Sequence, residues 1–414
     1  TYRELSKATF SLRSLRAADV DLRLAVDRWL SLPGDVHDVK LHLRLTDGRL
    51  EVPIEANMAG VAMSGNLLVD GSLETPRFRV ALGTRDSPLG GLAELLAGAR
   101  GMQGHLGRFS LELSAEGDQG SELMTSLDVR LALAGGRLTY GNVDGGRPVE
   151  FGLDQFEVAL PAHKPLRGSA RGTLLRQPFV MSLSGGTLER VMQDERSPVD
   201  LRIRSGSVRA ALSGIAAAPT DTSGPEVSFD ISADRTDDVA RWLGIPAGAS
   251  ARVGLRGKAS MTANDWALQG LLLRVGKSTV RVDASSIAAQ TPPLRLRVDA
   301  EHIDAGELQS LVPQRPGKPA AAAGPGRPVL EIPILPKGID LGDADVQIRV
   351  ARIGGTALDP RDIAFDGRIR DGAMQPSSFS AVIADIPFRG AVSLDMRGAE
   401  PQSSLWLSAG DIDV

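Results

Sequence analysis

Three residues of the sequence have the types and order found at the end of a phosphate-binding loop. They are Gly276, Lys277 and Ser278 in "GLLLRVGKST". In such a loop the glycine-rich backbone cradles phosphates, the lysine reaches their oxygens and the hydroxyl holds magnesium. The motif needs a glycine five positions before Gly276, where Leu271 stands, and it must open a helix. Since the following "STVRVDASS" alternates apolar and polar residues, we predict a hairpin turn at Gly276–Lys277 and no nucleotide site.

Other residue combinations that could carry chemistry are weak in this chain. Only His37 and His42 lie close among the five histidines, and solvated surface positions explain them better than a convergent metal site. Aspartates such as Asp21, Asp299 and Asp345 alternate with arginines, which predicts cross-strand ion pairs rather than acid–base pairs. No "GxSxG" turn is present for a serine nucleophile. We therefore expect no catalytic residue, no metal ligand and no cofactor.

Composition narrows the class of protein. A net charge of -4 over 414 residues excludes a broad basic surface for nucleic acid, and 4% aromatic residues leave little for base stacking. Cysteine is absent, which removes disulfides and thiolate metal sites and suits a protein outside the cytosol. The sequence has no apolar run of about 18 residues and begins at Thr1 without a signal-like segment. We expect a piece of a longer protein, with any membrane anchor outside it.

The dominant pattern is strict alternation of apolar and polar residues, which places successive side chains on opposite faces of a strand. Asp, Arg and Ser occupy the polar face. One-sided strands of this kind are typical of antiparallel sheets, so we predict a mainly β protein. The residues expected to line its apolar face are Leu22, Leu24, Val26, Leu41, Leu43, Leu45, Val227, Phe229, Ile231, Val280, Val282, Leu294, Leu296, Val298, Val346, Ile348 and Val350.

Turn and helix signals separate these strands. "TDGRL", "AGGRL", "SGGTL" and "RDGAM" predict tight hairpins. Three strands run into a short Leu-rich segment, and Asp86–Ser87, Thr236–Asp237 and Asp304 are candidate helix N-caps. The segment "LGGLAELLAGARGMQGHLG", residues 89–107, is either a helix on a membrane surface or a plug packed against the sheet. Its glycines weaken an independent helix and favour packing.

An internal repeat organises the chain. Residues 19–50 align without a gap onto residues 343–374, and after a shift of one residue Gly65 aligns with Gly390 and Asp70 with Asp395. We expect an N-terminal β repeat unit over residues 1–120 with a short helix near 88–100, a β-hairpin segment over 121–220, a further β repeat unit over 221–312, a Pro/Ala/Gly-rich linker or loop over 313–338, and a truncated second copy of the 17–96 unit over 339–414.

The repeated phrases resemble those of a known family. In residues 242–313, "LLLRVGKSTVRV" fits the hairpin and "HIDAGELQSLVP" the closing phrase of the repeat of the AsmA family, the AsmA-like and TamB-like envelope proteins of Gram-negative bacteria. Residues 339–414 and 17–96 resemble the unit near the carboxyl end of these proteins.

This resemblance implies a fold and a function. The fold is a long antiparallel sheet of repeated hairpins curled into an open apolar groove, bridge-like, with a few short helices. The function is that of a non-enzymatic conduit for phospholipid between inner and outer membranes, supporting outer-membrane biogenesis. The location is the periplasm, with an inner-membrane anchor through an N-terminal helix outside this sequence. The partners are acyl chains, both membranes and envelope proteins, and not nucleic acid.

Other functions compete with this hypothesis. A periplasmic scaffold for outer-membrane protein assembly could use exposed sheet edges as pairing templates. A closed sandwich or solenoid adhesin ranks third and an enzyme last.

Overall fold

The structure is a computed structural model of the chain. It describes residues 15–17, 19–29, 36–89, 102–140, 149–174, 177–218, 224–243, 251–262, 264–307, 343–371, 373–395 and 402–410. The predicted linker at 313–338 and most of the helix expected near 88–100 lie outside these residues.

The described residues form the mainly β fold that alternation predicts. They contain 22 strands in a mostly antiparallel sheet that does not close on itself, together with short helices. The chain divides into two compact units. The N-terminal unit is residues 1–206 with 211–221, and the C-terminal unit is residues 207–210 with 222–414. No described helix is long and apolar enough to cross a membrane.

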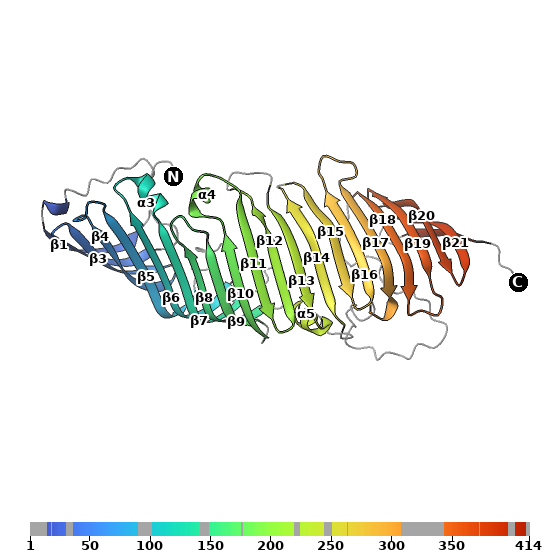
Figure 1. The fold of residues 1–414 in the computed structure, drawn as a ribbon, viewed down its shortest axis with the longest axis horizontal. Coiled ribbons are helices and arrows are strands. Elements are labelled where there is room, and N and C mark those ends of the chain that lie inside the picture. The colour runs from blue at the N-terminus through green and yellow to red at the C-terminus, as the bar shows by residue number, and fades with distance from the viewer. Residues whose placement is uncertain are drawn as a thin grey trace. The chain divides into compact units, whose positions relative to one another are not determined.

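In the N-terminal unit, each strand from β1 to β10 pairs antiparallel with the strand that follows it in the sequence. Figure 1 shows these strands side by side in chain order. The elements are β1 Val20–Trp29, β2 Val36–Thr46, β3 Arg49–Met58, β4 Val61–Asp70, β5 Arg77–Pro88, β6 Met102–Glu116, α3 Gly120–Thr125, β7 Asp128–Tyr140, β8 Val149–Leu160, β9 Arg167–Leu174, β10 Gln177–Gly185, α4 Leu188–Met192 and β11 Ser197–Ser205. Strand β12, Val208–Ala216, crosses the unit boundary.

The C-terminal unit continues the pattern with one exception. Its elements are β13 Glu226–Ala233, α5 Thr236–Leu243, β14 Val253–Met261, β15 Trp266–Val275, β16 Ser278–Ser286, β17 Leu294–Asp304, β18 Ala344–Gly354, β19 Arg361–Arg370, β20 Ala373–Ile383, β21 Ile386–Asp395 and β22 Gln402–Ala409. Strands β17 and β18 pair in parallel, which alternation alone does not predict. A parallel pair needs a long connection, and residues 305–343 supply it.

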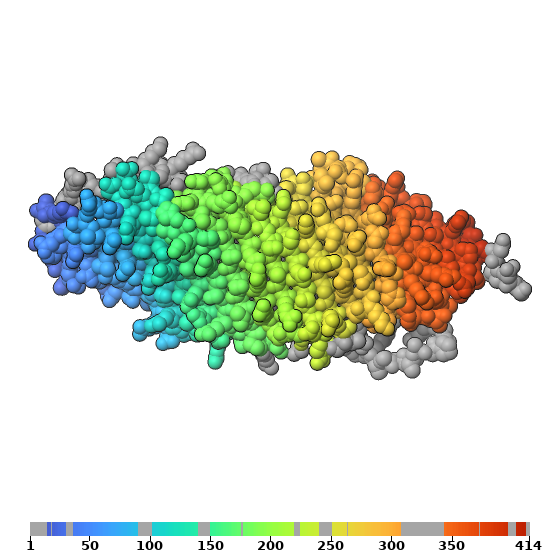
Figure 2. Space-filling view, in the orientation of Figure 1, coloured from blue at the N-terminus to red at the C-terminus, as the bar shows by residue number. Residues whose placement is uncertain are grey.

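Within each unit the packing is local in sequence. In Figure 2 the colour changes band by band along each unit, so that residues of one region do not mix with distant ones. Each strand therefore depends mainly on its two neighbours, as in other repeat architectures.

Three local predictions are wrong, and at two of the three positions a glycine or aspartate adopts a positive φ inside a strand. Gly135–Gly136 lies inside β7, where Gly135 adopts φ +67° and the register with β8 continues. The Gly185–Gly186 segment ends β10 and leads into α4, whose N-cap is Thr187. Asp86–Ser87 lies within β5, where Asp86 at φ +46° makes an irregularity of the strand rather than a helix cap.

Other local predictions are confirmed. The hairpin turns form at Asp47–Gly48 between β2 and β3, at Asp371 between β19 and β20, and at Gly276–Lys277 between β15 and β16. Helix α5 begins at Thr236, whose hydroxyl accepts the amide hydrogen of Ala251 at 3.2 Å, and an N-cap at Thr236–Asp237 stays a prediction. The carboxylate of Asp304 accepts the amide hydrogens of Gly306 and Glu307, as an N-cap does.

The repeat seen in the sequence is a repeat of backbone geometry. Asp38 in β2 and Asp362 in β19 have φ +53° and +51°, each at a register shift against the next strand. The turn residues Asp47 and Asp371 have φ +49° and +50°. Their amides donate to the carboxylates of aspartates that precede β1 and β18: Asp19 at 3.3 Å and Asp343 at 2.8 Å.

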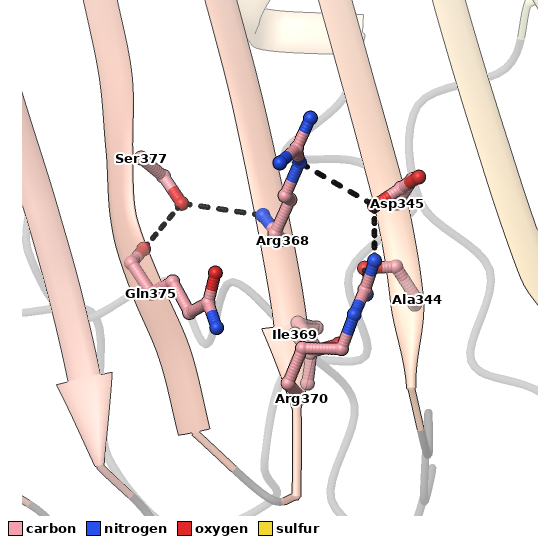
Figure 3. Close-up of polar contacts among 7 residues, drawn as sticks. All are labelled: Ala344, Asp345, Arg368, Ile369, Arg370, Gln375 and Ser377. Atoms are coloured by element: carbon pink, nitrogen blue, oxygen red, sulfur yellow. Dashed lines mark hydrogen bonds and ion pairs between the residues drawn. The ribbon is translucent and has the colours of Figure 1, made fainter. Parts of the chain in front are cut away.

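The one-residue shift in the repeat alignment is a β-bulge in β20. Between Met374 and Ser377 this strand carries one more residue than its partner β21, whereas β3 pairs with β4 in unbroken register. The buried Ser377 hydroxyl donates to the carbonyl of Gln375 at 2.6 Å and accepts the amide of Arg368 at 3.3 Å (Figure 3). The hydroxyl thus satisfies backbone groups that the extra residue takes out of the ladder.

Candidate functional site

One face of each unit carries a continuous surface of aliphatic side chains, which we call the apolar face. In an antiparallel sheet, directly paired residues point to the same side. In the N-terminal unit one row of paired residues crosses all strands from β1 to β11: Leu24, Leu41, Ile54, Gly65, Leu82, Leu111, Leu131, Val158, Gly168, Leu183 and Leu201. Glycine is the only interruption of this aliphatic row.

The C-terminal unit has an equivalent row. From β13 to β19 it runs through Ile231, Leu255, Leu273, Val280, Ala300, Val350 and Ile363. The parallel pairing of β17 with β18 does not interrupt it, because Val298 lies beside Ile348 and Leu296 beside Val346. Each unit therefore presents one apolar face of its own.

Every residue predicted to line the apolar face lies on it. Leu22, Leu24 and Val26 of β1 lie beside β2, which contributes Leu41, Leu43 and Leu45. Strand β13 contributes Val227, Phe229 and Ile231, and β16 contributes Val280 and Val282. Strand β17 contributes Leu294, Leu296 and Val298, and β18 contributes Val346, Ile348 and Val350.

The sequence prediction missed a large part of this face over β8 to β10. Phe151, Phe156 and Met181 pack against the buried cluster of the N-terminal unit. The alternation in β8 shifts between Leu153 and Gln155, where the register against β9 is irregular. In β10 the alternation of Phe179, Met181 and Leu183 is regular and was the available signal.

Burial on the apolar face is uneven. At one end of the strands, Val61, Leu106, Leu138 and Leu153 form a buried cluster with exposures of 0, 1, 6 and 7%. Further along the same strands, the large side chains of Leu82, Leu111, Leu131, Val158 and Leu183 stay partly exposed. A sheet face packed against a second protein layer would bury such residues almost completely. The middle of this face is therefore less completely covered than its end.

The opposite face, which we call the polar face, is held by ion pairs. Asp345 lies 3.0 Å from Arg370 and 3.9 Å from Arg368, its cross-strand partner (Figure 3). Arg349 donates two hydrogen bonds of 2.8 Å to Asp366. These contacts confirm the interpretation of the aspartates as surface ion-pair partners.

Two other aspartates depart from the predicted cross-strand arginine pairs. Asp299 pairs with Arg297 of its own strand at 2.8 Å, and this contact raises the pKa of the guanidinium. Asp21 bonds to His42 at 2.8 Å, which lowers the pKa of the Asp21 carboxyl. Both aspartates have structural partners that account for their charge.

Hollows in the surface lie over the polar face. In the N-terminal unit a hollow of about 1070 Å³ over β2 to β6 is bordered by charged residues that include Glu55, Arg85, Arg108 and Glu112. In the C-terminal unit a hollow of about 500 Å³ is bordered by Arg281, Asp299 and Arg349 among others. Charged linings of this kind do not suit an acyl chain.

The GKS segment binds an anion, but the anion is a carboxylate of the same chain. Lys277 donates its amide to Glu307 Oε1 at 2.9 Å, and Ser278 donates its amide and hydroxyl to Glu307 Oε2 at 3.0 and 2.6 Å. Burial raises the pKa of Glu307, and the hydrogen bonds from Ser278 and Lys277 outweigh that effect, so the pKa is lowered. A side chain at Gly276 would collide with this carboxylate. The turn therefore closes a hairpin and has no room for phosphate.

No cluster of three or more His, Asp or Glu side chains placed to hold a metal ion occurs in the described part of the chain. His37 bonds to Asp38 and His163 to Glu189. No protein-family model, curated protein or solved structure matches this chain.

Proposed function

We propose that this protein is a non-enzymatic lipid-binding conduit whose apolar faces shield the acyl chains of phospholipids from water. The observation that carries the proposal is the row of aliphatic side chains that crosses consecutive strands of each unit and stays partly exposed. The polar face offers no such surface, since ion pairs and exposed arginines occupy it.

The energetics favour an acyl chain as the ligand. Leaving acyl carbons in water costs about 0.8 kcal/mol per CH₂, or on the order of 13 kcal/mol for a chain of about sixteen carbons. An aliphatic surface recovers much of this cost without specific polar contacts. At about 4.8 Å per strand, the row from β1 to β11 extends for roughly 48 Å, so that a chain could move along it without meeting a polar gap.

The proposed setting is the envelope of a Gram-negative bacterium. The resemblance of residues 242–313 and 339–414 to the AsmA family supports a periplasmic location, an inner-membrane anchor and transfer of phospholipid toward the outer membrane. Under this proposal no catalytic residue and no cofactor take part, and transfer depends on the continuity of the apolar face.

The proposal is tested by the lipid content of the purified protein and of face-specific variants. Native mass spectrometry and lipid extraction of the full chain should show bound phospholipid. Leu296→Asp, on the apolar face, should reduce bound lipid at least tenfold because it buries a charge against acyl chains. Arg297→Asp, on the polar face of the same strand, should leave it within twofold. A lipid-free protein, or equal loss in both variants, would contradict the proposal.

The choice of Arg297 as the control follows from its contacts. Its pair with Asp299 is exposed to solvent, so little stability depends on it. Arg349, the equivalent neighbour of Ile348, is a poor control because its guanidinium also bonds the carbonyls of Ile348 and Phe365. Its replacement would disturb two strands as well as the surface charge.

A second candidate function is an assembly scaffold for outer-membrane proteins. The exposed apolar residues Leu405 and Trp406 on the last described strand favour it, because an open strand edge is a template for pairing. Such a scaffold needs no bound phospholipid, so the lipid measurement distinguishes the two.

A further inference from the structure

Two arginines on the polar face of the N-terminal unit lie directly opposite each other. Arg85 of β5 pairs with Arg108 of β6, and both side chains are exposed. The preceding pair, Thr84 with Phe109, points to the other side of the sheet and is buried. Like charges directly opposite destabilise a strand pair. No carboxylate of a described residue, the adjacent Asp86 included, lies within ion-pair distance of either guanidinium.

The C-terminal unit contains a second pair of opposed arginines, and there the charges are compensated. Arg352 of β18 lies opposite Arg361 of β19. Arg352 forms an ion pair of 2.7 Å with Asp359, and Arg361 forms one with Asp385. Opposed arginines are thus accommodated in this sheet with one carboxylate for each guanidinium. The pair in the N-terminal unit lacks both carboxylates.

A hollow of about 1070 Å³ on the polar face adjoins the uncompensated pair, and Arg85 and Arg108 are part of its lining. The next row of the lining consists of Ser64, Gly83 and Ser110, which pair directly across β4, β5 and β6. Their short side chains leave space beside the guanidinium groups. The two serine hydroxyls are additional hydrogen-bond donors at this place.

The acidic residues that line the same hollow have basic neighbours of their own: Glu55 with Lys40 at 3.8 Å, Asp38 with His37 at 2.7 Å, and Glu112 in register with Arg130. Glu112 is also four residues from Arg108, a separation of roughly 14 Å along an extended strand. The positive charge of the arginine pair is therefore not cancelled by the rest of the lining.

We propose that Arg85 and Arg108 bind the phosphate group of a phosphate monoester in this hollow. Such a group carries a charge of about -1.5 to -2 at pH 7, which matches two guanidinium groups, and its oxygens accept paired hydrogen bonds from each of them. A single carboxylate would neutralise only one. The hydroxyls of Ser64 and Ser110 donate to the remaining oxygens. The site lies on the polar face and needs no lipid on the apolar face.

Three probes carry this phosphate chemistry from different sources. They are inorganic phosphate, glycerol 3-phosphate, and vesicles of phosphatidic acid and phosphatidylcholine in equal amounts, with pure phosphatidylcholine vesicles as the blank. Calorimetry of the full chain measures binding of the first two, and co-sedimentation measures binding of the vesicles. Saturable binding of any of them supports the proposal, and the tightest-binding probe identifies the source. Dimethyl phosphate, a monoanion, should bind about tenfold more weakly than glycerol 3-phosphate.

Matched variants assign the binding to the arginine pair. Arg85→Gln and Arg108→Gln should each weaken binding of the best probe about tenfold or more. Arg79→Gln is the control, since Arg79 is an exposed arginine on the polar face of β5, opposite Ser114, and its loss changes the net charge equally. It should change binding less than about twofold.

Thermal unfolding provides a second readout that a merely structural role of the pair would not give. The probe should raise the Tm of the wild type in a saturable manner. Without the probe, Arg85→Gln should have a higher Tm than the wild type, because the repulsion is removed, and the probe should then raise its Tm much less. The proposal is overturned if no probe binds saturably, if dimethyl phosphate binds as well as glycerol 3-phosphate, or if Arg79→Gln weakens binding as much as Arg85→Gln does.

Discussion

The first strands of the two repeat copies, β1 and β18, have the same alternation of apolar and polar residues, but the apolar side chains are exposed in β1 and buried in β18. Val20 and Leu22 of β1 are both 42% exposed, whereas their equivalents Ala344 and Val346 of β18 are 0 and 9% exposed. Strand β18 lies between β17 and β19, and among the described residues β1 pairs only with β2. The sequence pattern thus decides which face is apolar, while the neighbouring strand decides how much of it water reaches.

The largest expected difference in stability between the two repeat copies follows from alanine substitution of Gly65 and of its equivalent Gly390, where neighbouring backbones approach closely. Gly65→Ala should destabilise the protein by about 2–3 kcal/mol, because the new side chain meets the Ala81 carbonyl and β5 is held in place by β6. Gly390→Ala should cost about half as much, since β22 pairs with only one strand among the described residues and can move more easily. Chemical denaturation measures both.

Gly254→Ala is the matched control for these two substitutions. No atom lies within 4 Å of a Cβ at that position. It should change stability by less than about 0.5 kcal/mol. Equal costs at Gly65 and Gly390 would mean that β22 is held as firmly as β5, although β5 pairs with two described strands and β22 with one.

The difference in burial between β1 and β18 predicts unequal costs of side-chain truncation. Val346→Ala should cost about 2 kcal/mol, because it leaves a cavity in a covered part of the sheet. Leu22→Ala removes more carbon but should cost less than about 1 kcal/mol, because that side chain is already exposed. A larger cost at Leu22, measured by thermal or chemical unfolding, would show that another element covers β1.

The hairpin between β15 and β16 has a more heavily hydrogen-bonded turn than the two repeat-equivalent hairpins. The Asp47 and Asp371 turns each donate one backbone amide to a carboxylate, whereas in the Gly276–Lys277 hairpin the amides of Lys277 and Ser278 and the Ser278 hydroxyl all donate to Glu307. Glu307→Gln should cost about 1–1.5 kcal/mol of local stability. Hydrogen exchange of residues 276–279 should report this loss.

The local stability of the Gly276–Lys277 turn should decrease at low pH, because the ionised Glu307 carboxylate closes it. The folded pKa of Glu307 lies below its ordinary value of 4.5, so its stabilising contribution is complete above that pH. The contribution is lost as the pH falls through the lower folded pKa. The protection of the tip amides, relative to their intrinsic exchange rate at each pH, should therefore fall below about pH 4.5 in the wild type. If Glu307→Gln loses protection to the same extent, a different group controls the turn.

The smallest expected changes in stability come from replacing Asp19 and Asp343, whose carboxylates accept the turn amides of Asp47 and Asp371. Asp343→Ala should cost about 1 kcal/mol, because it removes a 2.8 Å hydrogen bond to the amide of Asp371. Asp19→Ala should cost about half of that, since its bond to Asp47 is 3.3 Å long and exposed. The reverse order, in urea denaturation, would argue against equivalence of the two turns.

Alternation predicted the strands and their faces because side chains on a strand alternate whatever the strand pairs with. All residues proposed for the apolar face, from Leu22 to Val350, lie on it. Two of the errors occur where a turn-type residue lies inside a continuous strand. Gly135 and Asp86 adopt positive φ while the pairing register continues past them, and the sequence signals of glycine and aspartate are the same there as at a turn or cap.

Pairing between distant segments could not be predicted from the pattern of single strands. The parallel contact of β17 with β18 depends on a connection of residues 305–343, and the burial of Val346 depends on that contact. The carboxylate that occupies the GKS turn comes from Glu307, about one strand pair further along the chain. Local spacing excluded a phosphate loop but carried no information on which side chain replaces the phosphate.

Site-specific photocrosslinking tests the central claim, that the apolar face carries lipid, most directly. A photoreactive amino acid is placed at Leu24 or Ile348 on the apolar face of the two copies, and at Arg23 or Gln347 on the polar face of the same strands. The protein is then loaded with phospholipid and irradiated. The account predicts phospholipid adducts at Leu24 and Ile348 and at least tenfold fewer at Arg23 and Gln347. Equal labelling of the two faces, or none at Leu24 and Ile348, would contradict it.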